Sequence, residues 1–386
     1  MRRSYLVGLA LLLMLAISVF AVACGGGTTT TSAAATETTT ADTAPATDTT
    51  AAPQTSETTA AISLDTKINV KPRTLGILNE SGAASPTLMK GQTAVEMAAK
   101  ALGWKTIIID AQSDTQKTLA GFQSLVAQKV DAIITLTVEA SWVRPGLAAA
   151  KDAGIPSVQA TGGTEKSPLW TGQYEEDESE MGRVIGDYIA RTYPNAKIAV
   201  MTASGGAAGR TRFESFKKAL AGANTGATVV ATAEQSMTDP VNTTIKGLGD
   251  ILRANPDINI VYGIYDMSTP GSLAAIKNER SSAKFFSYYT SPYMVEQLMA
   301  DTALEGVMDV ELPKTAVIGV DQLLGLLEKN TPVDPDAIKN QGGLKYEVVA
   351  RSEVAEKLPV PAEGLFPNSE LVLKYITKWA QEYGTK

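Results

Sequence analysis

The chain has 386 residues, of which 19% are charged, with a formal net charge of −7, one Cys and no His. Its length suits two domains of ordinary size, and its mild acidic excess argues against a nucleic-acid groove, which needs clustered Lys and Arg. Without His the chain cannot form a Ser-His-Asp triad, a Cys-His pair or a His-ligated zinc site, whereas carboxylate or Lys catalysis remains open.

A secretory signal peptide is predicted over residues 1–23, because a basic start and a short apolar run lead to small residues before Cys24. Residues 21–24 read Ala-Val-Ala-Cys, which resembles a lipoprotein box and implies that Cys24 is lipidated and anchors the chain to the cell membrane, on its extracytoplasmic face. The alternative is an ordinary signal cut near Ala23 with an incidental Cys. Because Cys24 is the only Cys, no internal disulfide can form.

A disordered tether is predicted over residues 24–66. Residues 25–61 are rich in Thr and Ala and contain no aromatic residue, Lys or Arg. Such a segment has almost nothing to bury, so it cannot offset the entropy that folding removes. This composition is typical of a linker that holds a domain away from a membrane.

Between residues 73 and 163, short apolar runs alternate with segments of helix length. The runs occupy residues 75–78, 106–109, 132–134 and 157–158. This alternation predicts a parallel sheet built from strand–helix–strand units. In such sheets the ligand lies beyond the carboxyl ends of the strands. The candidate positions therefore follow Leu78, Asp110, Thr135 and Val158.

Four candidate ligand-binding residues follow these strands. Glu80 and Ser81 lie in a loop of small residues, where a backbone can approach a ligand closely; a plain turn with Ser85 as a helix cap is the alternative. Glu139 and Trp142 follow the third strand, and Trp142 could either stack on a ligand or pack within the lobe. The sequence has no GxGxxG or Walker A motif here, so nucleotide binding has no support.

Two stretches carry a family resemblance. Val-Asp-Ala-Ile-Ile at 130–134 and Ala-Gly-Ile-Pro-Ser-Val at 153–158 resemble type I periplasmic binding proteins, especially the sugar-binding receptors of ABC importers. The resemblance runs from about Arg73 to Asn330. It implies an α/β fold with two Rossmann-like lobes, each built on a parallel sheet, joined by a multi-strand hinge. The expected parts are an N-terminal lobe of residues 72–176 plus 311–330, a C-terminal lobe of residues 177–310, and a C-terminal extension of residues 331–386 that packs across the hinge.

The resemblance also implies ligand contacts near the crossovers between the lobes. Asp177 stands where the family has an acidic crossover residue, although the acidic run 175–180 could equally be a solvated helix start. The segment 301–313 resembles the return crossover. Asp309 or Glu311 would then lie near the hinge and the cleft.

In the predicted C-terminal lobe, Arg212 matches the ligand-contacting Arg of the family. Its forked donors suit hydroxyls or a carboxylate. Arg210 is a competing candidate, and a surface Arg212 paired with Glu214 is the alternative. Asp266 falls at a strand end, where members of the family have a side chain that accepts hydrogen bonds from sugar hydroxyls. The alternative is that Asp266 only caps a helix.

Two other positions depart from the pattern of ribose-type receptors. Thr161 lies where those receptors have an Asp-Arg pair, and Tyr289 lies near the position of a usual Asp. Both are expected to line the cleft. A neutral Thr and an aromatic Tyr suit a ligand that is less hydroxylated and more apolar or aromatic than a plain pentose or hexose.

The resemblance implies a lipid-anchored, extracytoplasmic solute-binding receptor of an ABC importer for a sugar or a sugar-like molecule. Its expected partners are the solute, an ABC permease and the bilayer through Cys24, with no nucleic acid, cofactor or metal. A ligand-sensing subunit for a membrane signalling protein is the alternative. A secreted hydrolase would need a catalytic constellation, and none is visible without His. We therefore expect no catalytic residue.

Overall fold

The computed structural model describes residues 61–163, 165–203, 206–358 and 363–386. The predicted signal peptide, Cys24 and most of the predicted tether lie outside these residues. The end of the tether needs correction, because Ile62 and Leu64 pack against a buried apolar cluster and Ile68 belongs to that cluster. Within the described part of the chain, no helix is both long and apolar enough to cross a membrane.

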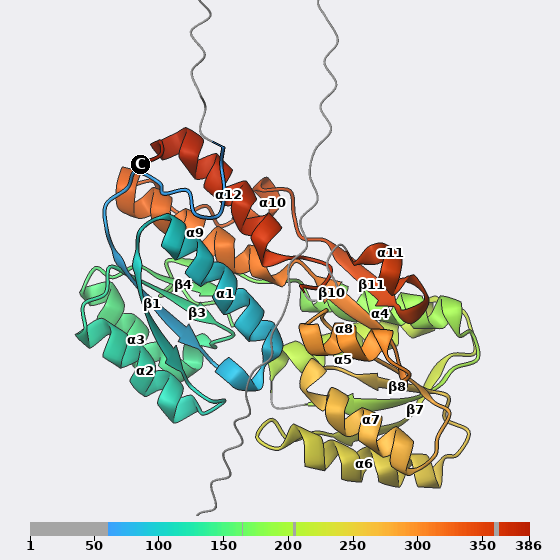
Figure 1. Cartoon of the computed structure of the whole chain (residues 1–386). Helices are drawn as coiled ribbons and strands as arrows, with labels where there is room; N and C mark the ends of the chain where they lie inside the picture. Colours follow the sequence, from blue (N-terminus) through green and yellow to red (C-terminus); the bar gives the residue numbers. More distant parts are fainter. Residues whose placement is uncertain (1–60, 164, 204–205, 359–362) are drawn as a thin grey trace, which may run out of the picture. The chain divides into compact units, whose positions relative to one another are not determined.

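The first sheet is fully parallel and has five strands in the order β2-β1-β3-β4-β5. Figure 1 labels three of them, β1, β3 and β4. Its strands are β1 (Thr74–Asn79), β2 (Lys105–Asp110), β3 (Ala132–Leu136), β4 (Ser157–Ala160) and β5 (Gly172–Tyr174). The first four contain the apolar runs of the sequence. The parallel order confirms the predicted strand–helix–strand arrangement, since each parallel pair needs a crossover connection.

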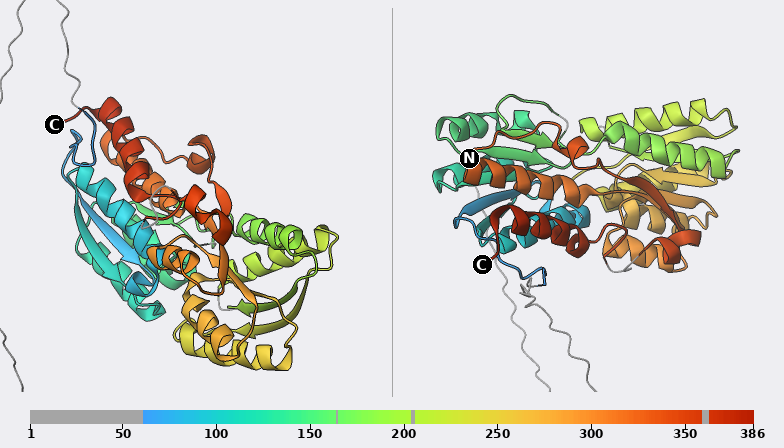
Figure 2. Two further views of the ribbon diagram at one scale, coloured as in Figure 1. Left: turned by 45° about the vertical axis from the view of Figure 1, so that its right-hand side comes forward. Right: turned by 90° about the horizontal axis from the view of Figure 1, so that it is seen from above.

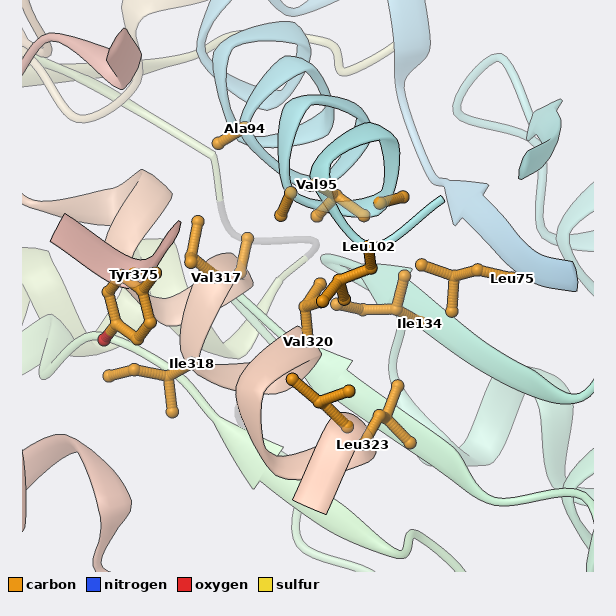
Figure 3. Packing of buried hydrophobic residues seen from close by; sticks show 14 of the residues in the cluster. Leu75, Ala94, Val95, Leu102, Ile134, Val317, Ile318, Val320, Leu323 and Tyr375 are labelled. Atoms are coloured by element: carbon orange, nitrogen blue, oxygen red, sulfur yellow. The ribbon is translucent and has the colours of Figure 1, made fainter. Parts of the chain in front are cut away.

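Helices cover both faces of the first sheet. These are α1 (Pro86–Ala101), α2 (Thr115–Ala127), α3 (Ala140–Asp152), α9 (Leu312–Lys329) and α12 (Asn368–Tyr383), with the short η1 (Gly82–Ala84) and α10 (Ala337–Asn340). Successive strand side chains point to opposite faces. Leu75 and Ile134 therefore pack with α1 and α9 (Figure 3), whereas Leu78 and Ile133 pack with α2 and α3.

The second sheet has six strands in the order β11-β10-β9-β8-β6-β7. They are β6 (Lys197–Thr202), β7 (Thr228–Glu234), β8 (Ile260–Gly263), β9 (Lys284–Tyr288), β10 (Leu304–Val310) and β11 (Tyr346–Ala350). All neighbouring strands are parallel except β10 and β11. The predicted return crossover at 301–313 is therefore mostly the strand β10, and the crossing itself occurs at Glu311.

Helices also cover both faces of the second sheet. Residues of α4 (Glu178–Thr192) and α5 (Ala207–Gly222) share a buried cluster with Val200 and Tyr262. On the opposite face, residues of the other helices share a cluster with Met201 and Val261. These helices are α6 (Pro240–Ala254), α7 (Thr269–Asn278), α8 (Pro292–Met299) and α11 (Val354–Lys357). The short turns η2 (Asp266–Ser268) and η3 (Arg351–Glu353) precede α7 and α11.

The C-terminal segment contacts both sheets. Strand β11 pairs with β10 in the second sheet, and α12 packs against α1 and α9 beside the first sheet. Both views in Figure 2 show this orange-to-red segment passing from one sheet to the other. We call each sheet with its helices the N-terminal lobe and the C-terminal lobe. The predicted residue bounds of the lobes stay a proposal. So does the C-terminal extension as a separate part, since its strand β11 continues the second sheet.

Candidate functional site

A cavity of about 480 Å³ lies between the two lobes, at the carboxyl ends of their strands. Its walls come from the segments after β1, β3, β4 and β5 of the N-terminal lobe, and from the start of α5 and the segments after β8 and β9 of the C-terminal lobe. Seven of the residues predicted from the sequence line it, namely Glu80, Ser81, Glu139, Trp142, Arg212, Asp266 and Tyr289. The competing candidate Arg210 lines it as well.

Asp177 and Glu311 do not line this cavity, in contrast to the prediction. Asp177 is exposed and caps α4, because its Oδ1 accepts hydrogen bonds from the N–H groups of Ser179 and Glu180. Glu311 lines a different cavity, accepts a hydrogen bond from the N–H of Lys345 and lies 3.6 Å from the Lys314 ammonium. Both carboxylates therefore serve local structure at the crossovers.

Thr161 and Asp309 lie outside the cavity wall as well. Thr161 is fully buried, and its hydroxyl lies 3.1 Å from the hydroxyl of Thr137, which does line the cavity. Asp309 is buried and accepts hydrogen bonds from the N–H and the hydroxyl of Thr290. Burial raises the pKa of Asp309. These two residues thus support the backbone behind the cavity.

Arg212 is the most fully paired side chain of the site. It is 2% exposed, and its Nε donates to Glu178 while its two terminal nitrogens donate to the carbonyl of Ile264 (3.1 Å) and the hydroxyl of Tyr289 (2.7 Å). The guanidinium also lies over the rings of Tyr265 and Tyr288, 4.9 and 4.6 Å from their centroids. A buried Arg in this setting is rigid, and it fixes the positions of the groups around it.

Two acidic residues at the first crossover face the cavity instead of Asp177. Glu176 and Glu178 are both 4% exposed, and Glu176 accepts a hydrogen bond from the N–H of Gly162 at 3.1 Å. Burial, together with the nearby charge of Glu178, raises the pKa of Glu176 to about 7. The Oε1 atom of Glu178 is buried and has no hydrogen-bond partner among the described residues.

Asp266 connects the two lobes. Its Oδ2 accepts a hydrogen bond of 2.6 Å from the hydroxyl of Thr87, which lies in the first turn of α1. Ser85, the N-cap of that helix, accepts a hydrogen bond from the N–H of Leu88, as the capping alternative predicted. Burial raises the pKa of Asp266. This residue is therefore a buried carboxylate that meets the opposite lobe directly.

The outer wall of the cavity is built by two loops of the N-terminal lobe. Ser81 donates a hydrogen bond to Glu80, and burial raises the pKa of Glu80. Glu139 accepts a hydrogen bond of 2.8 Å from the N–H of Glu165, whose own carboxylate accepts one of 2.7 Å from the N–H of Ser141. These reciprocal bonds hold both carboxylates at the rim.

Three residues near the cavity have left-handed backbone conformations. Thr137, Thr161 and Tyr289 have φ values of 59°, 60° and 66°, and each follows the end of a strand. This conformation is uncommon for residues other than Gly and is strained for a branched or bulky side chain. Such strain often occurs where the fold must direct a side chain into a functional site.

Sequence reasoning missed several residues of the cavity wall, among them Thr87, Glu176, Glu178 and Tyr265. One signal was available, since successive side chains of an extended segment point to opposite sides, and the acidic run 175–180 begins with such a segment just before α4. That alternation separates Glu176 and Glu178 from Asp177. Among the described residues, no group of three or more Cys, Asp or Glu is arranged to hold a metal ion.

Comparison with known proteins supports the architecture. The model of the family described as periplasmic binding protein domain matches residues 83–331. A ribose import binding protein of Bacillus subtilis is 27% identical over 212 residues, which cover 54% of this chain and 67% of that protein. An ABC transporter periplasmic-binding protein of Escherichia coli is 26% identical over 230 residues, 57% of this chain and 69% of that one.

Solved structures share the fold. An arabinose-binding protein of Shewanella, bound to arabinofuranose, has a TM-score of 0.63 and 23% identity over 73% of this chain and 93% of its own. A 5-methylthioribose transporter solute-binding protein of Thermotoga lettingae has a TM-score of 0.65 and 15% identity, and the match covers 80% of this chain and 98% of that one. Members of the matched family are transport binding proteins. With its family match and its two-lobed fold around a cavity, the chain belongs to the periplasmic binding protein family.

Proposed function

We propose that this chain is the solute-binding receptor of an ABC importer and that it binds a sugar or a sugar-like molecule in the cavity between its lobes. The observation that carries the proposal is the cavity of about 480 Å³, into which both lobes direct charged and aromatic side chains. Relatives named for ribose import, and structural neighbours solved with bound arabinofuranose or 5-methylthioribose, support this ligand class.

The side chains of the cavity suit a small polyhydroxy ligand. Carboxylates such as Asp266 and Glu176 accept hydrogen bonds from hydroxyl groups, and the half-buried Trp142 offers an aromatic face to the C–H face of a ring. A ligand held by both lobes stabilises the closed arrangement of such a two-lobed protein. We infer that the protein binds and releases its solute unchanged, as a receptor and not as an enzyme.

A ligand screen with one variant tests this function. Purified residues 61–386 are titrated with pentoses, hexoses, polyols and nucleosides by thermal shift and calorimetry. We expect one class to bind and to raise the melting temperature, since a ligand at 100 times its Kd stabilises the folded state by about 2.7 kcal/mol. Replacement of Asp266 by Ala should then weaken affinity by about 1.5–3 kcal/mol, or roughly 10- to 150-fold, because a charged hydrogen-bond acceptor is lost.

The matched control is Asp250→Ala on the exposed side of α6. The Asp250 carboxylate pairs with Arg253, and neither residue lines the cavity. Equal affinity of the Asp266→Ala variant and the wild type would contradict the site. A screen in which no compound binds would contradict the function, and recovery of a chemically altered ligand would contradict the receptor role.

We also propose that Cys24 carries a lipid that anchors the protein outside the cell membrane, next to a permease. The lipoprotein-box sequence supports this proposal. In the full chain, Cys24→Ser should move the protein from the membrane fraction to the soluble fraction and remove the mass of the lipid. Fractionation and mass spectrometry measure both effects. An unchanged membrane fraction would show that another segment holds the protein there.

A further inference from the structure

The cavity has far more negative than positive groups. Among the described residues that line it, six are carboxylates and two are arginines. The carboxylates are Glu80, Glu139, Glu165, Glu176, Glu178 and Asp266, and the arginines are Arg210 and Arg212. A neutral sugar needs acceptors for its hydroxyls, but it does not need this excess of charge.

Arg212 is already engaged inside the protein. Its guanidinium pairs with Glu178 and donates to Tyr289 and Ile264, so its positive charge is balanced within the C-terminal lobe. Three other carboxylates form no ion pair with any described residue, namely Glu80, Glu176 and Asp266. Their hydrogen bonds come from neutral donors. Glu176 accepts from the N–H of Gly162, and Asp266 accepts from the hydroxyl of Thr87. Among the described residues, these three carboxylates therefore form no direct ion pair, and the one cation near Glu176 and Asp266, Arg212, is already paired with Glu178.

A second observation points to a missing donor in the same wall. The side chain of Glu178 is 3% exposed, and its Oε2 is occupied by Arg212. Its Oε1 is buried and has no hydrogen-bond partner among the described residues, although Glu178 lines the cavity. A buried acceptor without a donor is costly. A ligand with several N–H donors would satisfy this atom and neutralise part of the surrounding charge.

We propose that the solute is a sugar or polyol with a protonated amino group, held by Glu176, Glu178 and Asp266. This inference rests on the proposed function and specifies its ligand class. An ammonium group offers three donors and a positive charge, which together match adjacent acceptors that share an uncompensated negative charge. An anionic solute would be repelled by the same groups, and a neutral one would bring no positive charge to pair with them.

The electrostatic state of the site is consistent with this ligand. Burial raises the pKa of Glu80 and the pKa of Asp266. Burial and the nearby charge of Glu178 together raise the pKa of Glu176 to about 7. The charged groups that face Glu176 are Glu178 on α4 and Arg212 on α5, and the phenols of Tyr289 and Tyr346 lie near it. A bound ammonium group favours the ionised form of Glu176, so binding and ionisation support each other.

Paired probes that differ only in one group test the inference. We would compare glucosamine with glucose, galactosamine with galactose, and glucamine with glucitol by calorimetry on residues 61–386. In at least one pair, the amine should bind at least tenfold more tightly than its hydroxyl counterpart. For glucamine, affinity should rise about tenfold from pH 6 to pH 8, as Glu176 ionises while an aliphatic amine stays protonated.

The variants Glu176→Gln and Glu178→Gln keep the shape of the side chain and remove its charge. Each should weaken binding of the amine probe at least tenfold, whereas Asp250→Asn on the exposed side of α6 should not change it. If the loss of the partner of Arg212 prevents Glu178→Gln from folding, Glu176→Gln decides, because Glu176 forms no ion pair with any described residue. Retained amine preference in the Glu176→Gln variant would overturn the inference.

The outcomes separate this inference from the proposed function. Equal or tighter binding of the hydroxyl partners would overturn the cationic ligand and leave the sugar receptor in place. An absence of binding by all six probes would count against both. Tighter binding of the amines, with the expected pH dependence, would support both.

Discussion

At the scale of single residues, the surroundings of a side chain determine whether its substitution measures ligand recognition or folding stability. Arg212 is a predicted ligand contact, yet it is also the buried partner of Glu178. Removal of one member of a buried ion pair typically costs about 3–5 kcal/mol, because the other charge stays buried without compensation. Loss of ligand binding in an Arg212→Ala variant would therefore mix stability with recognition. Asp266 forms no ion pair with any described residue, so a substitution there separates the effect on recognition from the effect on stability better than one at Arg212.

Glu176 gives a pH-dependent prediction at the same scale. The folded protein raises the pKa of Glu176 from 4.5 to about 7, so the folded state holds this proton more tightly than the unfolded state. Its contribution to stability is therefore complete below pH 4.5 and is lost as the pH rises to about 7. In the absence of ligand, Glu176→Gln should be more stable than the wild type at pH 8 by up to about 3 kcal/mol, with little difference at pH 4.

Urea unfolding at pH 4, 6 and 8 measures this effect. The control is Glu356→Gln, which removes one negative charge from an exposed position. A stability difference between the Glu176→Gln variant and the wild type that does not grow with pH would show that Glu176 is ionised at low pH in the folded protein.

At the scale of elements, α12 completes the N-terminal lobe. Its buried face contributes Val372, Ile376 and Trp379 to the cluster that contains residues of α1 and α9. The indole N–H of Trp379 donates to Asp321 at 2.8 Å, and Lys378 pairs with the same carboxylate. The helix thus joins the N-terminal lobe by both apolar contact and a buried polar link, although it lies far from α1 in the sequence.

Substitution of Trp379 tests the role of α12. Trp379→Ala should lower the free energy of unfolding by about 3–5 kcal/mol, because it leaves a large cavity and removes a donor from buried Asp321. Denaturant unfolding with circular dichroism measures it. Lys374→Ala, at an exposed position of the same helix, should stay within about 0.5 kcal/mol of the wild type. Equal effects of the two substitutions would mean that α12 does not support the lobe.

At the scale of the whole molecule, the cavity depends on how the two lobes meet. The bond between Thr87 and Asp266 is a buried contact across the cleft, and it joins the first turn of α1 to η2, which follows β8. The crossing segments also join the lobes, as does the C-terminal segment, whose β11 pairs with β10 and whose α12 packs against α1 and α9. This hydrogen bond therefore favours the arrangement in which the two lobes meet.

Removal of this bond should open the molecule. Thr87→Val keeps the size of the side chain and loses the donor, which should cost the closed arrangement about 1–3 kcal/mol. Small-angle scattering of the ligand-free variant should give a larger radius of gyration than the wild type. Thr93→Val, at an exposed position of the same helix, is the control. Identical scattering profiles would show that the bond does not set the lobe angle.

The sequence by itself determined the parallel α/β architecture, because apolar runs of strand length alternate with amphipathic segments of helix length, and this local periodicity decides which elements form. It also indicated the strand ends as the site, and seven predicted residues line the cavity. Only the tertiary structure decided that Glu176 and Glu178 face the cavity while Asp177 caps a helix, and that β11 joins the second sheet. Those outcomes depend on the direction of single side chains at a crossover and on contacts between distant segments, which local patterns do not contain.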